Sequence, residues 1–98
     1  MVVTVFRVRV REEANLAELE SLTQRMLTLV QGLPGFLSVK DFQAEDGEGL
    51  TLVEFDTIEN QMRWRDHPEH QAAQALGRTK FFKEYSVQVC ELVRGVRF

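Results

Sequence analysis

The hydrophobic residues of this chain follow two periods, and the order in which these periods alternate restricts the fold more than any other feature. Residues 2–10 place apolar side chains on one parity and Arg7 and Arg9 on the other, which is typical of a strand with one apolar face. Residues 15–31 repeat apolar side chains at steps of three and four, which predicts a helix that begins at Asn15 with Glu18 as its capping partner. The segment GLPG at 32–35 prevents this helix from continuing.

Two further strands are predicted over residues 36–42 and 50–55, on either side of the segment AEDGEG, whose glycines suit a hairpin. Asp56 is expected to begin a second helix, with Glu59 as its capping partner. That helix should break near His67 and restart, because Pro68 disfavours helical geometry in the preceding residue and is favoured at a first helical position. Helical character then continues to residue 77, and residues 85–93 form a final strand.

The order of these elements predicts one α+β domain over residues 1–98. Two split β-α-β units give a ferredoxin-like βαββαβ sandwich, in which an antiparallel four-stranded sheet carries two helices on one face. Several strands are apolar on both parities, for example Val3 and Val5 against Phe6 and Val8. Helices cover only one face, so we expect a second copy to cover the other and form a homodimer with its sheets face to face. The alternative is that β-branched residues are simply favoured in exposed strands.

Composition excludes several classes of partner. The net charge is −3 and Lys and Arg are scattered, so neither nucleic acid nor an acidic membrane surface is an expected partner. Cys90 lies in an apolar run, where we expect a buried, inert thiol. The N-terminal segment MVVTVFRVRV has no basic leader and no cleavage site, so it is predicted to be a strand of a cytoplasmic protein.

The segment WRDHPEHQAAQALGR, residues 64–78, concentrates the groups that carry chemistry. With Pro68 at the first position of a helix, His70 and Gln74 share a stripe that we expect to face the space between helix and sheet. An imidazole there exchanges protons near neutral pH. The alternative is that these side chains satisfy backbone groups at a helix start. The break at Pro68 and the lack of a further ligand at zinc-site spacing argue against a metal site, and we expect no metal or cofactor.

Trp64 lies off the helical stripe of Ile58 and Met62, which suits the rim of a pocket or a dimer contact. Aromatic residues that follow the second helix are candidates for a pocket wall, with core packing as the alternative. Polar residues inside apolar strands are candidates to orient a ligand. These further candidates are Phe81, Phe82, Tyr85, Arg7 and Glu54.

The segments VFRV, PGFLS, LTLVEFDT and above all WRDHPEHQAAQALGRTKFFKEYSVQV together resemble the antibiotic biosynthesis monooxygenase family of the dimeric α+β barrel superfamily. The resemblance implies a ferredoxin-like protomer, a homodimer and a small-molecule cavity between helices and sheet. Family activities include cofactor-independent oxygenation of phenolic polycyclic substrates, quinol oxidation and haem degradation. Haem degraders share the residue at Trp64, but they have a histidine where this chain has Gln74, so haem would lack its axial ligand.

The resemblance leads to a cofactor-independent oxygenase or quinol oxidase that acts on a small aromatic or polycyclic phenol. We expect His70 to be the base, Trp64 and Gln74 to bind or pack against the substrate, and Arg7 to stabilise its anion. His67 is a second candidate base, which the break at Pro68 turns outward. The competing functions are a dimer that binds a small aromatic molecule without turnover, and an interaction module that has no cavity.

Overall fold

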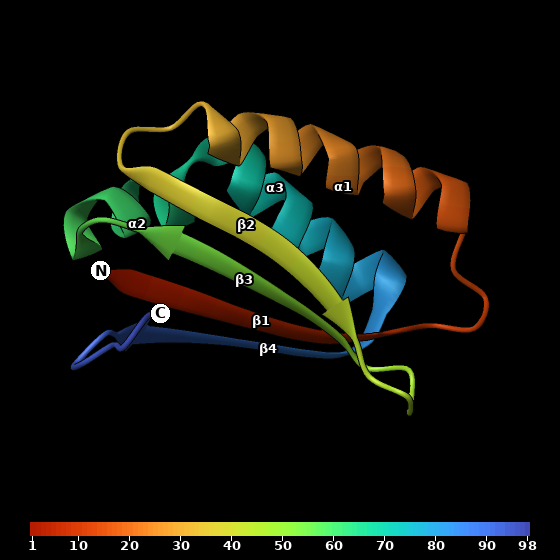
Figure 1. Ribbon diagram of the computed structural model, residues 1–98. Helices are drawn as coiled ribbons and strands as arrows, with labels where there is room; N and C mark the ends of the chain where they lie inside the picture. Colours follow the sequence, from red (N-terminus) through yellow and green to blue (C-terminus); the bar gives the residue numbers. More distant parts are fainter.

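A computed structural model describes all residues, 1–98, as one antiparallel sheet with helices on one face (Figure 1). The strands pair in the order β2-β3-β1-β4. Along the chain the elements are β1 (Val2–Val10), α1 (Leu16–Gln31), β2 (Phe36–Gln43), β3 (Gly49–Phe55), α2 (Ile58–Asp66), α3 (Pro68–Leu76), a π-helical turn (Gly77–Phe81) and β4 (Phe82–Glu91). The predicted ferredoxin-like α+β fold is confirmed, with the interrupted second helix present as two helices, α2 and α3.

The start of α1 follows the sequence prediction, whereas that of α2 does not. Asn15 is the N-cap of α1, and its Oδ1 accepts a hydrogen bond from the Glu18 backbone N–H at 3.1 Å. The N-cap of α2 is Thr57, whose Oγ1 accepts from the Asn60 N–H at 3.2 Å. The prediction that Asp56 begins α2 was wrong. Asp56 follows the end of β3, where its N–H donates to the Gly35 carbonyl, and its carboxylate accepts from the Asn60 side chain. Glu59 is therefore not its capping partner.

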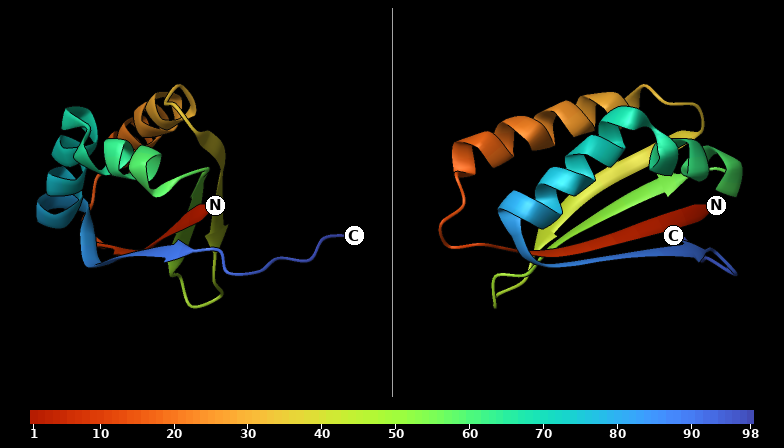
Figure 2. Two further views of the ribbon diagram at one scale, coloured as in Figure 1. Left: turned by 90° about the vertical axis from the view of Figure 1, so that its left-hand side faces the viewer. Right: turned by 180° about the vertical axis from the view of Figure 1, so that it is seen from behind.

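The break between α2 and α3 lies where Pro68 predicts it. His67 is extended (φ −62°, ψ 129°), and its Nδ1 accepts from the Glu69 backbone N–H at 3.2 Å, so it ends α2 and caps α3. Figure 2 shows α3 running beside α1 over the same face of the sheet. The change of direction at His67 thus places both parts of the second helical segment above the strands.

The last strand begins three residues earlier than predicted. Phe82 already pairs with Val10 of β1, and the register shifts between Arg9 and Val10. The π-helical turn before it ends at Phe81, which is 1% exposed. The Arg11 guanidinium closes this turn through hydrogen bonds to three backbone carbonyls, those of Arg78, Thr79 and Phe82. The sequence FKE lacks apolar alternation, so the pattern gave no sign of this first part of β4.

The main core lies between α1, α2 and the end of the sheet that holds β3. Its buried residues are Val30, Val53, Phe55 and Trp64. Phe36 and Phe55 meet edge to face, with ring centroids 6.3 Å apart. Val30, Val53 and Trp64 also line a cavity, so the core continues directly into a space between the helices and the sheet.

Candidate functional site

A cavity of about 200 Å³ separates the helices from the sheet, and 14 of its 22 lining residues are hydrophobic. Alternate residues of each strand point to this side, since successive side chains of a strand face opposite ways. Thr4 and Phe6 of β1 therefore line the cavity together with Val87 and Val89 of β4, which are opposite them in the sheet. Residues of α1, α2 and α3 form the other wall.

His70 and Trp64 form the main polar feature of this cavity. Their rings stack, with centroids 3.6 Å apart and an angle of 11° between the planes. The His70 Nδ1–H donates to the Trp64 backbone carbonyl at 2.8 Å, because a carbonyl can only accept. This bond assigns the proton to Nδ1 and leaves the lone pair on Nε2 for a ligand.

The surroundings of His70 favour its neutral form. Burial lowers the pKa of the imidazole below its ordinary value, and the nearby charge of His67 lowers it further. The hydrogen bond to the Trp64 carbonyl opposes both effects but does not outweigh them. A neutral imidazole in an apolar cavity is a group that can accept a proton from a bound acid at neutral pH.

Two more of the expected residues share the cavity on the helix side. Trp64 is 6% exposed, packs on the core with one part of its ring and lines the cavity with another. Gln74 lies one turn beyond His70 on α3 and also lines the cavity. Both side chains carry N–H groups that are suited to the oxygen of a bound ligand.

An aromatic wall closes the sheet side near the π-helical turn. Phe6, Phe82 and Tyr85 pack together, with Phe6 edge-on to Phe82 at 5.9 Å and to Tyr85 at 5.1 Å between centroids. Burial raises the pKa of the Tyr85 phenol, although the charge of Arg78 opposes this. Tyr85 therefore stays protonated at neutral pH and offers an O–H next to the apolar wall.

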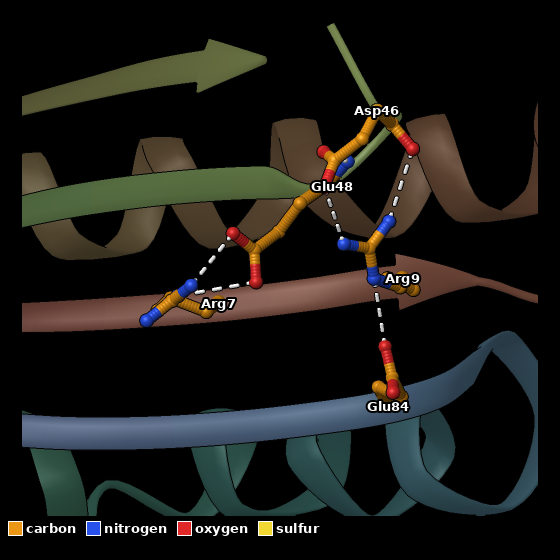
Figure 3. A network of polar contacts seen from close by, with 5 residues as sticks. All are labelled: Arg7, Arg9, Asp46, Glu48 and Glu84. Carbon is orange, nitrogen blue, oxygen red and sulfur yellow. Dashed lines mark hydrogen bonds and ion pairs between the residues drawn. The ribbon is translucent and has the colours of Figure 1, made fainter. Parts of the chain in front are cut away.

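Arg7 and Glu54 lie on the opposite face of the sheet and do not line the cavity. Their strand positions alternate with those of the cavity residues, so their side chains point away from the helices. Figure 3 shows Arg7 bonded to both carboxylate oxygens of Glu48. Glu54 accepts a hydrogen bond from Ser38. We expected these two residues to orient a ligand in the cavity, but their positions in the strands place their side chains on the other face of the sheet.

His67 and Phe81 are also outside the cavity lining. His67, the second candidate base, uses Nδ1 to cap α3. Phe81 is almost completely buried at the end of the π-helical turn, so it is a core residue and not part of the pocket wall.

A buried polar pair at the cavity, Thr4 and Gln61, was not predicted from the sequence. Gln61 Nε2 donates to Thr4 Oγ1 at 3.2 Å, and Gln61 and Thr4 are 3% and 6% exposed, respectively, at the residue level. A signal existed, because Thr4 shares the parity of Val2 and Phe6 on the apolar face of its strand. A polar residue at such a position is hydrogen-bonded when it is buried.

The comparisons with known proteins assign the family. Residues 1–76 match the family model described as antibiotic biosynthesis monooxygenase, and the chain belongs to this family. A relative, the uncharacterized protein YqjZ from Bacillus subtilis, is 38% identical over 71 residues, which are 72% of this chain and 62% of that protein. The chain therefore spans less than two thirds of this relative.

Solved structures show the same fold. Rv0793 from Mycobacterium tuberculosis matches with a TM-score of 0.83 at 20% identity, covering 98% of both chains. SnoaB, a cofactor-independent oxygenase from Streptomyces nogalater, matches with a TM-score of 0.77 at 16% identity, covering 97% of this chain and 95% of that chain. No helix of the present chain has the length and apolar character needed to span a membrane.

Proposed function

We propose that this chain is a cofactor-independent monooxygenase or quinol oxidase that acts on a small hydroxylated aromatic molecule. The observation that carries the proposal is His70, whose bond to the Trp64 carbonyl leaves Nε2 as a neutral base at an apolar cavity. Membership of the monooxygenase family and the fold shared with SnoaB support the same reaction class. The protein needs few groups for this chemistry, because the ionised substrate itself is the reductant of dioxygen.

The proposed reaction starts with transfer of the substrate hydroxyl proton to His70 Nε2. The resulting anion is electron-rich, and the apolar walls exclude water while the N–H groups of Trp64 and Gln74 bind its oxygen. In a quinol oxidation, two electrons and two protons pass to dioxygen and give a quinone and hydrogen peroxide. In a monooxygenation, one oxygen atom of dioxygen becomes a carbonyl on a ring carbon, and the other leaves as water with the hydrogen of that carbon and the proton of the hydroxyl group.

The size of the cavity limits the substrate. An apolar cavity of roughly 150 Å³ holds a single benzene ring, so about 200 Å³ suits one or two rings. Further rings of a polycyclic substrate would extend through the open side. Haem degradation is disfavoured, because Gln74 stands where the resembling haem degraders have a histidine.

Dioxygen uptake with a panel of quinols and anthrones tests the proposal. His70→Ala should lose most of the uptake while it still binds the aromatic compound, because the base and not the cavity is removed. His67→Ala is the matched control, since His67 is the neighbouring histidine outside the cavity. Equal uptake by both variants would contradict the role of His70. Binding without uptake in the unmodified protein would favour the competing function of a non-enzymatic binding protein.

We also propose that the uncovered face of the sheet pairs with a second copy. This face carries Val3, Val5, Leu50 and Leu52, and no helix covers it (Figure 2). Its Cys90 is exposed in the single chain, which corrects the expectation of a buried thiol, because Cys90 pairs with Val3 on this face. Alkylation of Cys90 should become faster on dilution as the dimer separates. A rate that does not depend on concentration, together with a monomeric mass, would contradict the dimer.

A cytoplasmic location stays a prediction.

A further inference from the structure

Gln61 is a polar side chain that the proposed mechanism does not use. It lies on α2, faces the sheet and lines the same cavity as His70. Its side-chain amide has two ends, and only one of them has a partner: Nε2 donates to Thr4 Oγ1. A buried amide that leaves one end unpaired is unfavourable unless that end reaches water or a ligand.

The free end of this amide opens onto the cavity. No fully buried side-chain nitrogen or oxygen in the chain lacks a hydrogen-bond partner. The Gln61 Oε1 accepts no hydrogen bond within the chain, so it is in contact with the cavity space that Gln61 lines. Thr4 holds the amide from the strand side by accepting from Nε2, which leaves Oε1 as the end towards the cavity.

We infer that Gln61 is the specificity-determining residue of the cavity and that its Oε1 accepts a hydrogen bond from a hydroxyl group of the aromatic ligand, other than the hydroxyl whose proton passes to His70. This inference rests on the proposed function of the site, but it concerns the choice of ligand and not turnover. An aromatic ligand with a hydroxyl gives Oε1 its missing donor. A ligand of the same shape without a donor leaves the buried oxygen unpaired, and sites built around such a bond reject the analogue that lacks it.

Three ligands of similar size separate the possibilities: phenol, which donates a hydrogen bond, anisole, which only accepts one, and toluene, which does neither. Affinities are measured by NMR titration of the folded protein. The unmodified chain should bind phenol roughly fivefold more tightly than toluene, which is the effect of one hydrogen bond of about average strength. Anisole should bind no better than toluene, because it has no proton for Oε1.

Variants assign this preference to Gln61. Gln61→Met keeps the length of the side chain and removes the acceptor, so phenol and toluene should bind within about twofold of each other. Thr4→Val frees the amide and should weaken the preference for phenol without changing the affinity for toluene. Gln24→Met, on the exposed side of α1, is the matched control and should retain the full preference. In His70→Phe the imidazole can no longer accept from the hydroxyl, so a preference for phenol that remains in this variant is due to Gln61.

Tighter binding of anisole than of phenol would overturn the inference, because it would show that the amide presents its N–H to the cavity. A preference for phenol that survives in Gln61→Met and disappears in His70→Phe would overturn it as well. If Gln61→Met does not fold, the ratio of phenol to anisole in the unmodified chain and the Thr4→Val variant decide. His70-dependent dioxygen uptake without a preference for phenol would refute only this inference, whereas a cavity that binds none of the three ligands would refute the proposed function too.

Discussion

Replacing Gly35 by alanine tests how the start of β2 is held against α2, the helix that carries Gln61 and Trp64. Gly35 has φ +77°, and an added Cβ would lie 2.2 Å from Asp56 Oδ1 and 2.3 Å from Asn60 Nδ2. Those two atoms are hydrogen-bonded to each other at 2.9 Å, so the methyl group must displace them. Left-handed geometry costs about 1–2 kcal/mol for a residue with a Cβ, and loss of the bond adds about 1 kcal/mol. Gly35→Ala should therefore lower the free energy of unfolding by about 2–3 kcal/mol.

Gly47→Ala is the matched control, because Gly47 has φ +93° and no atom within 4 Å of an added Cβ. It carries the backbone strain without the clash. The difference between the two variants is therefore the lost bond, and we expect Gly35→Ala to melt roughly 4–8 °C below Gly47→Ala. The assay is thermal unfolding followed by circular dichroism at one protein concentration, since association makes the midpoint concentration-dependent. Midpoints that agree within about 2 °C would refute the argument that the Asp56–Asn60 contact restricts this position.

Three further changes test other contacts. Arg11→Lys keeps the charge but loses the fork that binds two carbonyls of the π-helical turn and that of Phe82 in β4, so the melting temperature should fall by about 5–10 °C, and an unchanged midpoint would contradict this. Glu48→Gln removes the exposed ion pair with Arg7 and should shift the midpoint by less than about 4 °C, a larger loss showing that the pair is structural. Burial lowers the pKa of His70 below its ordinary value of 6.5. As the pH falls below this value, the imidazole takes up a proton more readily in the unfolded chain than in the folded one, so the free energy of unfolding decreases. His70→Phe should therefore show a smaller drop in the urea midpoint between about pH 7 and pH 5 than the unmodified chain, and equal drops would contradict the buried neutral state.

The fold was predictable because the spacing of hydrophobic residues changes between the strand period and the helix period at recognisable capping and breaking residues. Pro68 determined the break between α2 and α3, and Asn15 determined the start of α1. The start of α2 was not predictable in the same way. Asp56 and Thr57 are both good N-caps by residue type, and the choice between them depends on the Gly35 carbonyl, which accepts from the Asp56 N–H and belongs to the turn before β2.

The site was predictable only in part, because it depends on which side of each strand faces the helices. His70, Gln74 and Trp64 line the cavity as expected, while their catalytic roles stay predictions. Arg7 was expected at the cavity although its parity is opposite to that of Phe6, and strand geometry then places it on the uncovered face. Gln61 could not be recognised from spacing alone, since its partner Thr4 is 57 residues away.

The tautomer of His70 is the most direct test of the account, because the proposed base exists only if Nε2 carries a lone pair. Long-range proton–nitrogen NMR of the labelled imidazole measures it at neutral pH. The structure predicts a neutral ring with its proton on Nδ1, bonded to the Trp64 carbonyl. A proton on Nε2, or a ring that is already cationic at about pH 7, would contradict the account.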